Sequence, residues 1–241
     1  MPPLAVSLGD PAGIGPEIIV ASWARRRESK LAPFFVVGGT TVLEKAAAVR
    51  DLACPIVPID DAAEANDAFD RGLPVLGAED GTYRPGVPDD AGAALALGSL
   101  AGAVRMALLG KASAAVTAPV SKAHLARVGF EFPGQTEFLA AACGLGPNDV
   151  VMMLAGPSLR AVPVTVHCAL ADVPRLLDKA TIAAKARITA AALTRDFGIA
   201  APRIAICGLN PHAGEGGKFG SEERDIIAPA IETLRAEGMA V

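Results

Sequence analysis

Aromatic side chains are scarce in this chain of 241 residues, where Phe, Trp and Tyr together make up only 4% of the sequence. Hydrophobic residues nevertheless reach 51%, and most of them are small aliphatic side chains. A core without large rings requires close approach between backbones, as occurs where helices pack on a parallel sheet. The length suffices for one large α/β domain or two smaller ones.

Long basic runs are also missing. The densest cluster of cations is Arg25-Arg26-Arg27, and the net charge is −4 with an isoelectric point near 5.4. Binding to nucleic acid depends on a basic stripe that neutralises phosphates. We therefore expect no nucleic-acid partner.

Paired cysteines and targeting segments are missing as well. The N-terminal residues 1–7 lack the basic region and apolar stretch of a secretory signal. The most apolar segment, residues 91–110, is mainly Ala and Gly and carries Arg105, so we expect a buried helix and no membrane partner. Four cysteines without a Cys-x-x-Cys pair indicate buried, reduced thiols in a cytoplasmic protein. They are Cys54, Cys143, Cys168 and Cys207.

Strand and helix patterns alternate along the chain, which predicts parallel strands joined by helical crossovers. Apolar runs predict strands at residues 4–8, 34–37, 114–117, 150–154, 161–167 and 203–207. Helical patterns cover residues 16–27, 41–50, 90–109, 136–143, 173–197 and 222–237. The stretch 60–90 is rich in Gly, Pro and Asp and indicates an irregular segment. We expect two α/β parts, residues 1–123 and 124–241.

Helix ends have local signals. Asp90 and Ser221 are predicted to cap the helices that follow them. Gly198 and Gly238 are predicted to stop helices, and Pro229 is predicted to kink or divide the last one. After Gly238 the chain looks like the opening of a further strand, so we expect a fragment of a longer fold.

A glycine-rich turn joins the first strand to the first helix, in Gly9-Asp10-Pro11-Ala12-Gly13-Ile14-Gly15. Glycines allow backbone N–H groups to approach an anion at a helix N-terminus. The spacing G-x-x-x-G-x-G differs from the dinucleotide motif, and no acidic residue follows the second strand. A tight packed turn is the alternative, and both interpretations stay open.

Two further segments carry polar side chains near element ends. Thr117–Lys122 leaves a predicted strand at its carboxyl end, where ligands of α/β sheets bind, so Thr117, Ser121 and Lys122 are candidates for a phosphate or carboxylate. Lys122 is equally typical of a surface lysine. In the other segment, Gln135 and Thr136 stand at the start of an apolar helix.

Two of the three histidines, His167 and His212, are placed at predicted strand ends. Neutral imidazole is a common ligand of zinc-like ions, so the pair predicts a divalent-metal site, with a structural role as the alternative. Catalytic sites usually present three ligands, so a third must come from an acid, a partner subunit or further chain. The glycine-rich residues 214–220 either fold over a cofactor or form a mobile connection.

Five segments together resemble the 4-hydroxythreonine-4-phosphate dehydrogenase family. They are GDPAGIGPE (9–17), TAPVSK (117–122), GQTEFLA (134–140), MMLAGPSLRAVPVTVH (152–167) and GLNPHAGEGGKFGSEE (208–223). The resemblance implies an isocitrate/isopropylmalate-dehydrogenase-like α/β fold, with two α/β/α parts around a cleft and largely parallel sheets. It also implies a cytoplasmic homodimer whose subunits share the active site.

The implied reaction is oxidation of a secondary alcohol, 4-phosphohydroxy-L-threonine, by NAD or NADP, followed by decarboxylation on the route to vitamin B6. His167 and His212 match metal-binding histidines of the family, for Zn, Mg or Co, and Gln135 and Thr136 match its substrate-contacting pair. A bound divalent cation stabilises negative charge on the alcohol oxygen.

Two departures limit the resemblance. Gln135 replaces a family histidine and cannot carry an imidazolium charge, which favours other substrates such as an aromatic cis-dihydrodiol carboxylate or a sugar-acid phosphate. The family also continues for roughly another hundred residues with a third metal histidine, so we expect this chain alone to be inactive. A phosphotransacetylase-like transferase and a non-catalytic binding module are the alternatives from other classes.

Overall fold

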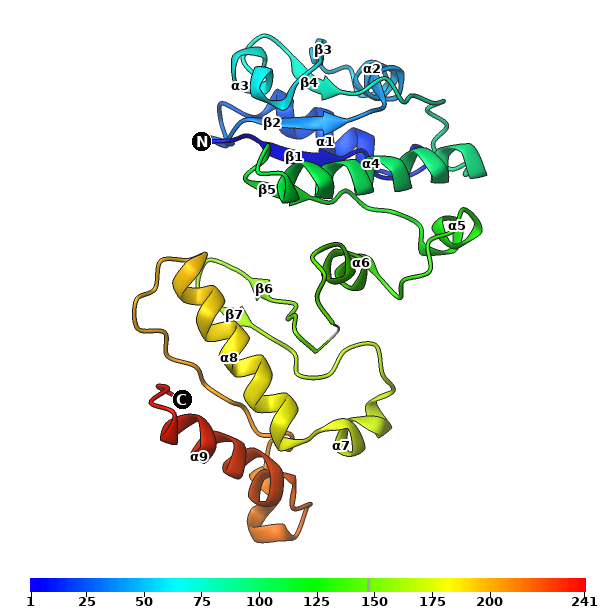
Figure 1. The fold of residues 1–241 in the computed structure, drawn as a ribbon. Coiled ribbons are helices and arrows are strands. Elements are labelled where there is room, and N and C mark those ends of the chain that lie inside the picture. The colour runs from blue at the N-terminus through cyan, green and yellow to red at the C-terminus, as the bar shows by residue number, and fades with distance from the viewer. Residues whose placement is uncertain (147) are drawn as a thin grey trace. The chain divides into compact units, whose positions relative to one another are not determined.

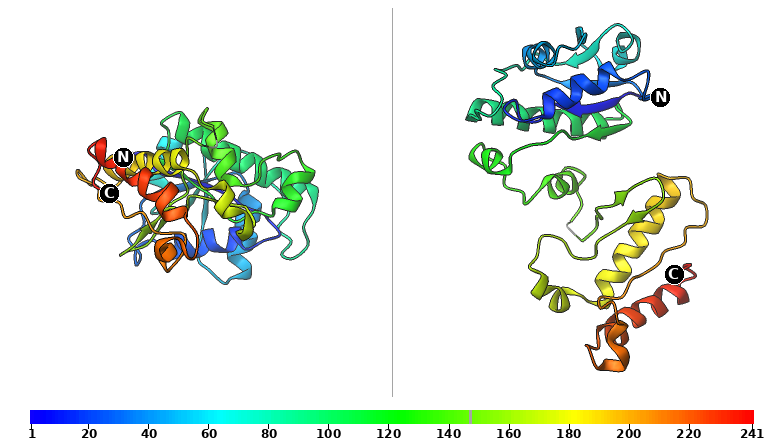
Figure 2. Two further views of the ribbon diagram at one scale, coloured as in Figure 1. Left: turned by 90° about the horizontal axis from the view of Figure 1, so that it is seen from below. Right: turned by 180° about the vertical axis from the view of Figure 1, so that it is seen from behind.

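The computed structural model describes residues 1–146 and 148–241. Contacts between Cα atoms divide the chain into two compact units, Met1–Gln135 (unit 1) and Thr136–Val241 (unit 2). Figure 1 and Figure 2 show the elements of each unit. The division expected at 123/124 falls inside helix α5 (Lys122–Arg127), which packs against a helix of unit 1.

Unit 1 is built around a parallel sheet of five strands in the order β3-β4-β2-β1-β5. The central strand β1 pairs Leu4 with Phe34 on one side and with Ala114 on the other. Parallel pairing, expected from the alternation of strand and helix, is confirmed here. The strands are β1 (Leu4–Ser7), β2 (Phe34–Val37), β3 (Ile56–Ile59), β4 (Leu73–Leu76) and β5 (Ala114–Val116).

The prediction that residues 60–90 are irregular was wrong over β4, and β3 was not predicted at all. Each strand contains a proline, Pro58 in β3 and Pro74 in β4. Proline lacks a ladder donor and argues against a strand when only the local sequence is read. Pairing of β4 with both β2 and β3 decides the conformation instead. The same stretch holds the short helices η1 (Ala62–Glu64) and α3 (Ala65–Ala68).

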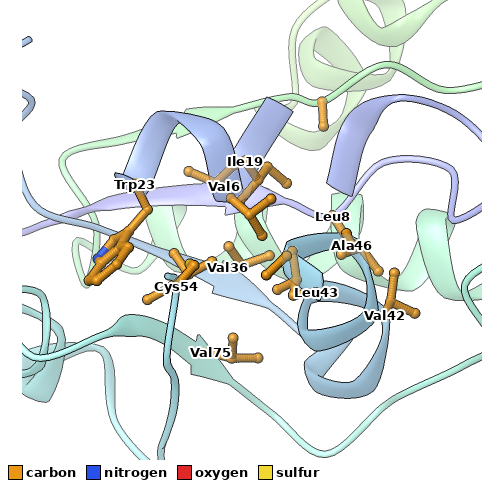
Figure 3. Packing of buried hydrophobic residues seen from close by; sticks show 14 of the residues in the cluster. Val6, Leu8, Ile19, Trp23, Val36, Val42, Leu43, Ala46, Cys54 and Val75 are labelled. Atoms are coloured by element: carbon orange, nitrogen blue, oxygen red, sulfur yellow. The ribbon is translucent and has the colours of Figure 1, made fainter. Parts of the chain in front are cut away.

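Helices cover both faces of this sheet. Val6 and Val36 belong to a core cluster with side chains of α1 and α2, which Figure 3 shows from close by. Their strand neighbours Ala5 and Phe35 belong to a second cluster with side chains of α3 and α4, because successive strand residues point to opposite faces. These helices are α1 (Gly15–Ala24), α2 (Thr40–Val49), α3 and α4 (Asp90–Leu108).

Helix α4 is long and apolar enough to cross a membrane, by length and composition alone. In unit 1 it packs along β1, β2 and β5. Its buried Ser99 hydroxyl accepts from the Leu8 N–H at 2.8 Å and donates to the Val37 carbonyl at 2.6 Å. These contacts are those of a core helix. The capping residue is Asp89, which accepts from the Gly92 N–H at 2.7 Å, and the predicted cap Asp90 is the first helical residue.

Unit 2 is mainly helical, and α8 and α9 pack against each other. The division of the last helix at Pro229 is confirmed, since Pro229 stands in the first turn of α9 after a π-helical segment. Ser221 holds the predicted cap position, because its carbonyl accepts from the Asp225 N–H at 2.8 Å and Glu222 already has helical backbone angles. The elements are α6 (Gln135–Ala142), η2 (Leu170–Asp172), α7 (Val173–Leu176), α8 (Lys179–Arg195), η3 (Ala213–Gly217), η4 (Glu223–Ile227) and α9 (Ala228–Ala236).

Strands are short in the described part of unit 2. The antiparallel pair β6 (Leu154–Ala155) and β7 (Arg160–Ala161) and one parallel bridge between Arg203 and Ala240 replace the strands predicted at 150–154, 161–167 and 203–207. Apolar alternation predicts an extended chain, but a strand also needs a neighbour for its N–H and C=O groups. Over most of these segments the described residues provide no such ladder.

The cysteines differ in their exposure. Cys54 is buried in the core of unit 1, Cys168 is half-buried, and Cys143 and Cys207 are exposed. The expectation of buried thiols is therefore confirmed for Cys54 and wrong for Cys143 and Cys207, whose apolar sequence neighbours do not cover them. All four are free, as expected from their spacing.

Candidate active site

The carboxyl ends of β1 and β5 bring together the three polar segments predicted in unit 1. The Ser7 hydroxyl accepts from the Ala118 N–H at 3.0 Å, and the Asp10 N–H donates to the Pro119 carbonyl at 3.1 Å. The Gln135 amide Nε2 lies 3.4 Å from the Ala118 carbonyl. The glycine-rich turn, the 117–122 segment and Gln135 thus meet, within unit 1, at the carboxyl ends of these strands.

The glycines of the turn are explained by close packing. A Cβ atom on Gly9, whose φ is +75°, would lie 2.8 Å from both the Ala118 Cβ and the Pro119 carbonyl oxygen. A Cβ atom on Gly15 would lie 2.9 Å from the Leu8 carbonyl oxygen. No side chain fits at either place. This supports the packed-turn interpretation, and no residue of the turn needs a phosphate to account for it.

The 117–122 segment ends in a local contact between Ser121 and His124. The Ser121 hydroxyl lies 2.7 Å from the Nδ1 atom of His124, one turn further along. Both side chains are half-buried, whereas Lys122 is exposed. Lys122 therefore has the surface position that was the alternative to a ligand contact, and His124 has a structural partner.

In unit 2, the loop from 208 to 223 carries His212, and hydrogen bonds of Asn210 connect residues within this loop. The Asn210 N–H donates to Oε1 of Glu223 at 2.8 Å, and its side-chain Nδ2 donates to the Phe219 carbonyl at 3.0 Å. Its Oδ1 accepts from the His212 N–H at 2.9 Å. The hydrogen bond from the Asn210 backbone keeps the pKa of Glu223 below its usual value. Asn210 and Glu223 therefore fix the loop that presents His212.

Asn210 and Glu223 were not among the residues predicted for the site. Both stand in the segment GLNPHAGEGGKFGSEE, the most specific of the five matching stretches. An Asn two residues before the candidate ligand was a signal, because Asn side chains often bond backbone groups two residues on. The contact with Glu223 spans thirteen positions and has no local sequence signature.

The His212 side chain contacts an acidic and an aromatic residue of the same loop. It is exposed, its Nδ1 atom lies 3.1 Å from Oε1 of Glu215, and its ring lies 5.8 Å from that of Phe219. Metal-binding histidines usually donate their second ring N–H to a carboxylate. A proton on Nδ1 puts the lone pair of a neutral imidazole on Nε2.

His167 is also exposed, and its backbone has a φ of +54°. A non-glycine residue in this region is uncommon and marks a conformation that the surrounding structure imposes. The prediction that each histidine follows a strand was wrong, since β7 ends at Ala161 and residues 208–212 lie in a loop. Both are therefore presented by irregular backbone.

The two histidines offer the kind of donor that binds a divalent cation. His167 and His212 are neutral-imidazole donors of the kind that zinc-like ions prefer. Over residues 1–146 and 148–241, no group of three or more His, Cys, Asp and Glu side chains converges as a metal site. Gln135 and Thr136, the first residues of α6, are half-buried, and the boundary between the two units falls between them.

Comparisons with known proteins give a consistent result. A family model described as pyridoxal phosphate biosynthetic protein PdxA matches residues 30–241. The 4-hydroxythreonine-4-phosphate dehydrogenase of Erythrobacter litoralis strain HTCC2594 is 62% identical over 237 residues, which are 98% of this chain and 70% of that protein. The crystal structure of the Klebsiella pneumoniae enzyme of that name matches with a TM-score of 0.88 and 35% identity, covering 100% of this chain and 74% of that one.

A third match is a terephthalate 1,2-cis-dihydrodiol dehydrogenase from Burkholderia xenovorans LB400, with a TM-score of 0.63 and 30% identity over 100% of this chain and 72% of that one. The fold class expected from the sequence is confirmed by these structures, which match the whole chain. The chain therefore belongs to the PdxA family of 4-hydroxythreonine-4-phosphate dehydrogenases.

Proposed function

We propose that this dehydrogenase acts on its substrate beside a divalent cation held by His167 and His212. The reaction itself is the NAD-dependent oxidation of 4-phosphohydroxy-L-threonine followed by decarboxylation, in pyridoxal phosphate biosynthesis. The observation that supports the cation is the contact between Nδ1 of His212 and Glu215, which leaves Nε2 of an exposed imidazole free. The transferase alternative is set aside, because these relatives are dehydrogenases.

The residues of this chain have distinct parts in the reaction. When bound, the cation supplies a Lewis acid that stabilises charge on the alcohol oxygen, and NAD supplies the hydride acceptor. His167 and His212 hold the cation, and Asn210 with Glu223 keeps the His212 loop in shape. Gln135 and Thr136 bind the substrate by hydrogen bonds, since neither carries a charge.

We further propose that a homodimer in the cytoplasm completes the site. Two imidazoles are fewer than the three protein ligands of most catalytic sites, and among the described residues no group of three or more His, Cys, Asp and Glu side chains could hold a metal. A residue from a second subunit or from additional chain would supply the missing donor. On this basis the 241 residues alone bind the cation weakly, and we expect them to be inactive.

The second candidate is a dehydrogenase for an aromatic cis-dihydrodiol carboxylate. Gln135 favours it, because an uncharged amide replaces the family's histidine. The similarity to a solved cis-dihydrodiol dehydrogenase supports it as well. A sugar-acid phosphate remains a third substrate class of the same chemistry. Formation of NADH with each alcohol in turn distinguishes these substrates.

The first prediction concerns the metal. We expect the 241 residues to form little or no NADH from 4-phosphohydroxy-L-threonine, and any NADH formation to require a divalent cation and to stop with a chelator, while the Erythrobacter enzyme is assayed beside them as the reference. Replacing His167 or His212 with Ala lowers the affinity for Co²⁺, measured by calorimetry, by about tenfold or more. His124→Ala is the matched control, since His124 contacts Ser121. Unchanged Co²⁺ affinity in the double His167/His212 variant would contradict the proposed site.

A further inference from the structure

The loop around His212 contains a glutamate in a conformation that suits glycine. Five consecutive residues have positive φ, with values of +49° at Ala213, +71° at Gly214, +41° at Glu215, +69° at Gly216 and +96° at Gly217. Glycine adopts this region at no steric cost, whereas residues with a Cβ avoid it. Gly214 is required here, because a Cβ atom would lie 2.8 Å from the Gly220 carbonyl oxygen. Glu215 is thus a non-glycine residue in a backbone conformation that is unfavourable for it.

The contact that Glu215 makes indicates what its side chain does. Its Oε1 lies 3.1 Å from Nδ1 of His212, and both side chains are largely exposed, by 47% and 67%. An exposed pair of this kind contributes little to stability. The contact is therefore better suited to orienting the imidazole than to holding the loop, which Asn210 and Glu223 already do.

The geometry points to Glu215 as the residue that selects the tautomer of His212. A carboxylate can only accept a hydrogen bond, so it places the imidazole proton on Nδ1. The lone pair is then on Nε2, where it is available to a cation. Glu215 is thus a positioning residue for His212, an assignment that rests on the proposed metal site.

The tautomer of His212 can be measured by NMR in the absence of metal. Long-range ¹H–¹⁵N spectra in alkaline buffer, where imidazoles are neutral, distinguish protonated from unprotonated ring nitrogens. The chain has only three histidines, so His212→Ala assigns the His212 signals. We expect the proton of His212 on Nδ1 in the wild type and on Nε2 in Glu215→Ala. Glu215→Gln keeps a carbonyl acceptor and retains most of the wild-type pattern.

Affinity for Co²⁺ gives the second readout. We expect Glu215→Ala to lower it by about 10- to 100-fold, and Glu215→Gln to lower it less. Glu232→Ala is the matched control, because it removes an exposed carboxylate from α9 of the same unit. We expect Glu215→Gly to unfold at or above the wild-type midpoint urea concentration, because glycine suits the positive φ of this position, so weaker Co²⁺ binding in that variant is not a consequence of unfolding.

The outcomes separate this inference from the proposed function. If Co²⁺ binding depends on His212 but neither the tautomer nor the affinity changes in Glu215→Ala, the inference is overturned while the metal site stands. If Glu215→Ala changes the tautomer of His212 but the chain binds no Co²⁺, the assignment of Glu215 is supported. The metal site of the proposed function is then contradicted.

Discussion

The buried thiol of Cys54 shows how the core of unit 1 acts on a single residue. Its side chain is only 7% exposed, among the residues of Figure 3. Burial raises its pKa to about 11, and the nearby charge of Arg26 opposes this only in part. The thiolate is the reactive form of cysteine, so a raised pKa and low exposure both suppress its chemistry.

We therefore expect the cysteines to differ in reactivity. In mildly alkaline buffer near pH 8, roughly one Cys54 thiol in a thousand is ionised. Iodoacetamide should modify Cys143 and Cys207, which are exposed, and leave Cys54 unmodified until denaturant is added. Peptide mass spectrometry after a timed reaction measures this. Labelling of Cys54 at the rate of Cys207 in the native chain would show that the core is open.

The buried hydroxyl of Ser99 is a second case in which one side chain supports the core of unit 1. Ser99 places one hydroxyl between the Leu8 N–H and the Val37 carbonyl, in a position closed to water. A buried polar group left without a partner costs about 1–3 kcal/mol, so both backbone groups depend on this side chain. The interaction links α4 to the ends of β1 and β2, next to the glycine-rich turn.

At the scale of elements, helix α8 depends on the cap at its N-terminus. Asp178 accepts from the Thr181 N–H at 2.8 Å and from its hydroxyl at 2.7 Å. These hydrogen bonds lower the pKa of Asp178 below its ordinary value of 3.8, with burial opposing them. Replacing it with Ala should destabilise the chain by about 1 kcal/mol at neutral pH, measured by urea unfolding.

The pH dependence of this cap has a definite sign. Because the folded pKa is lowered, the carboxylate's contribution is complete above the unfolded value and is lost as pH falls through the folded pKa. The stability difference between the wild type and Asp178→Ala should therefore shrink below pH 3.8. Asp178→Asn is the control, since Asn caps without a charge, and its advantage over Ala should persist in acid. An undiminished wild-type difference in acid would contradict this assignment.

At the scale of the whole molecule, the two units differ in how much backbone is paired. Unit 1 has five parallel strands between two layers of helices. In the described part of unit 2, strands are limited to β6, β7 and one bridge, and residues 154–161 are exposed. Local stability follows such buried contacts and backbone hydrogen bonds.

Hydrogen exchange should therefore be uneven along the chain. Amides of β1, β2 and β4 should exchange slowest, and those of 154–168 and 208–220 within the shortest labelling times. Peptide-level mass spectrometry reports each segment separately. Divalent metal should slow exchange of 208–220 while leaving β1 unchanged, which gives an internal reference. Slow exchange of 154–168 in the metal-free chain would mean that this segment is paired.

The sequence by itself determined the elements whose signals are local. Helices α1, α2 and α4, strands β1 and β2, and the stops at Gly198 and Gly238 follow from apolar periodicity and turn chemistry over a few residues. Both glycines indeed have positive φ, +68° and +85°. The five matching segments also identified the family, because short motifs can be recognised in a sequence without knowledge of the fold.

The tertiary structure alone decided the features that join distant residues. Strands β3 and β4 contain prolines and form only because they pair with each other and with β2. The Asn210–Glu223 contact, the Ser99 bridge and the meeting of Ala118 with Gln135 connect positions whose spacing follows no period. A residue's own neighbours in sequence set its backbone preference, whereas burial and hydrogen-bond partners come from chain that only folding brings near.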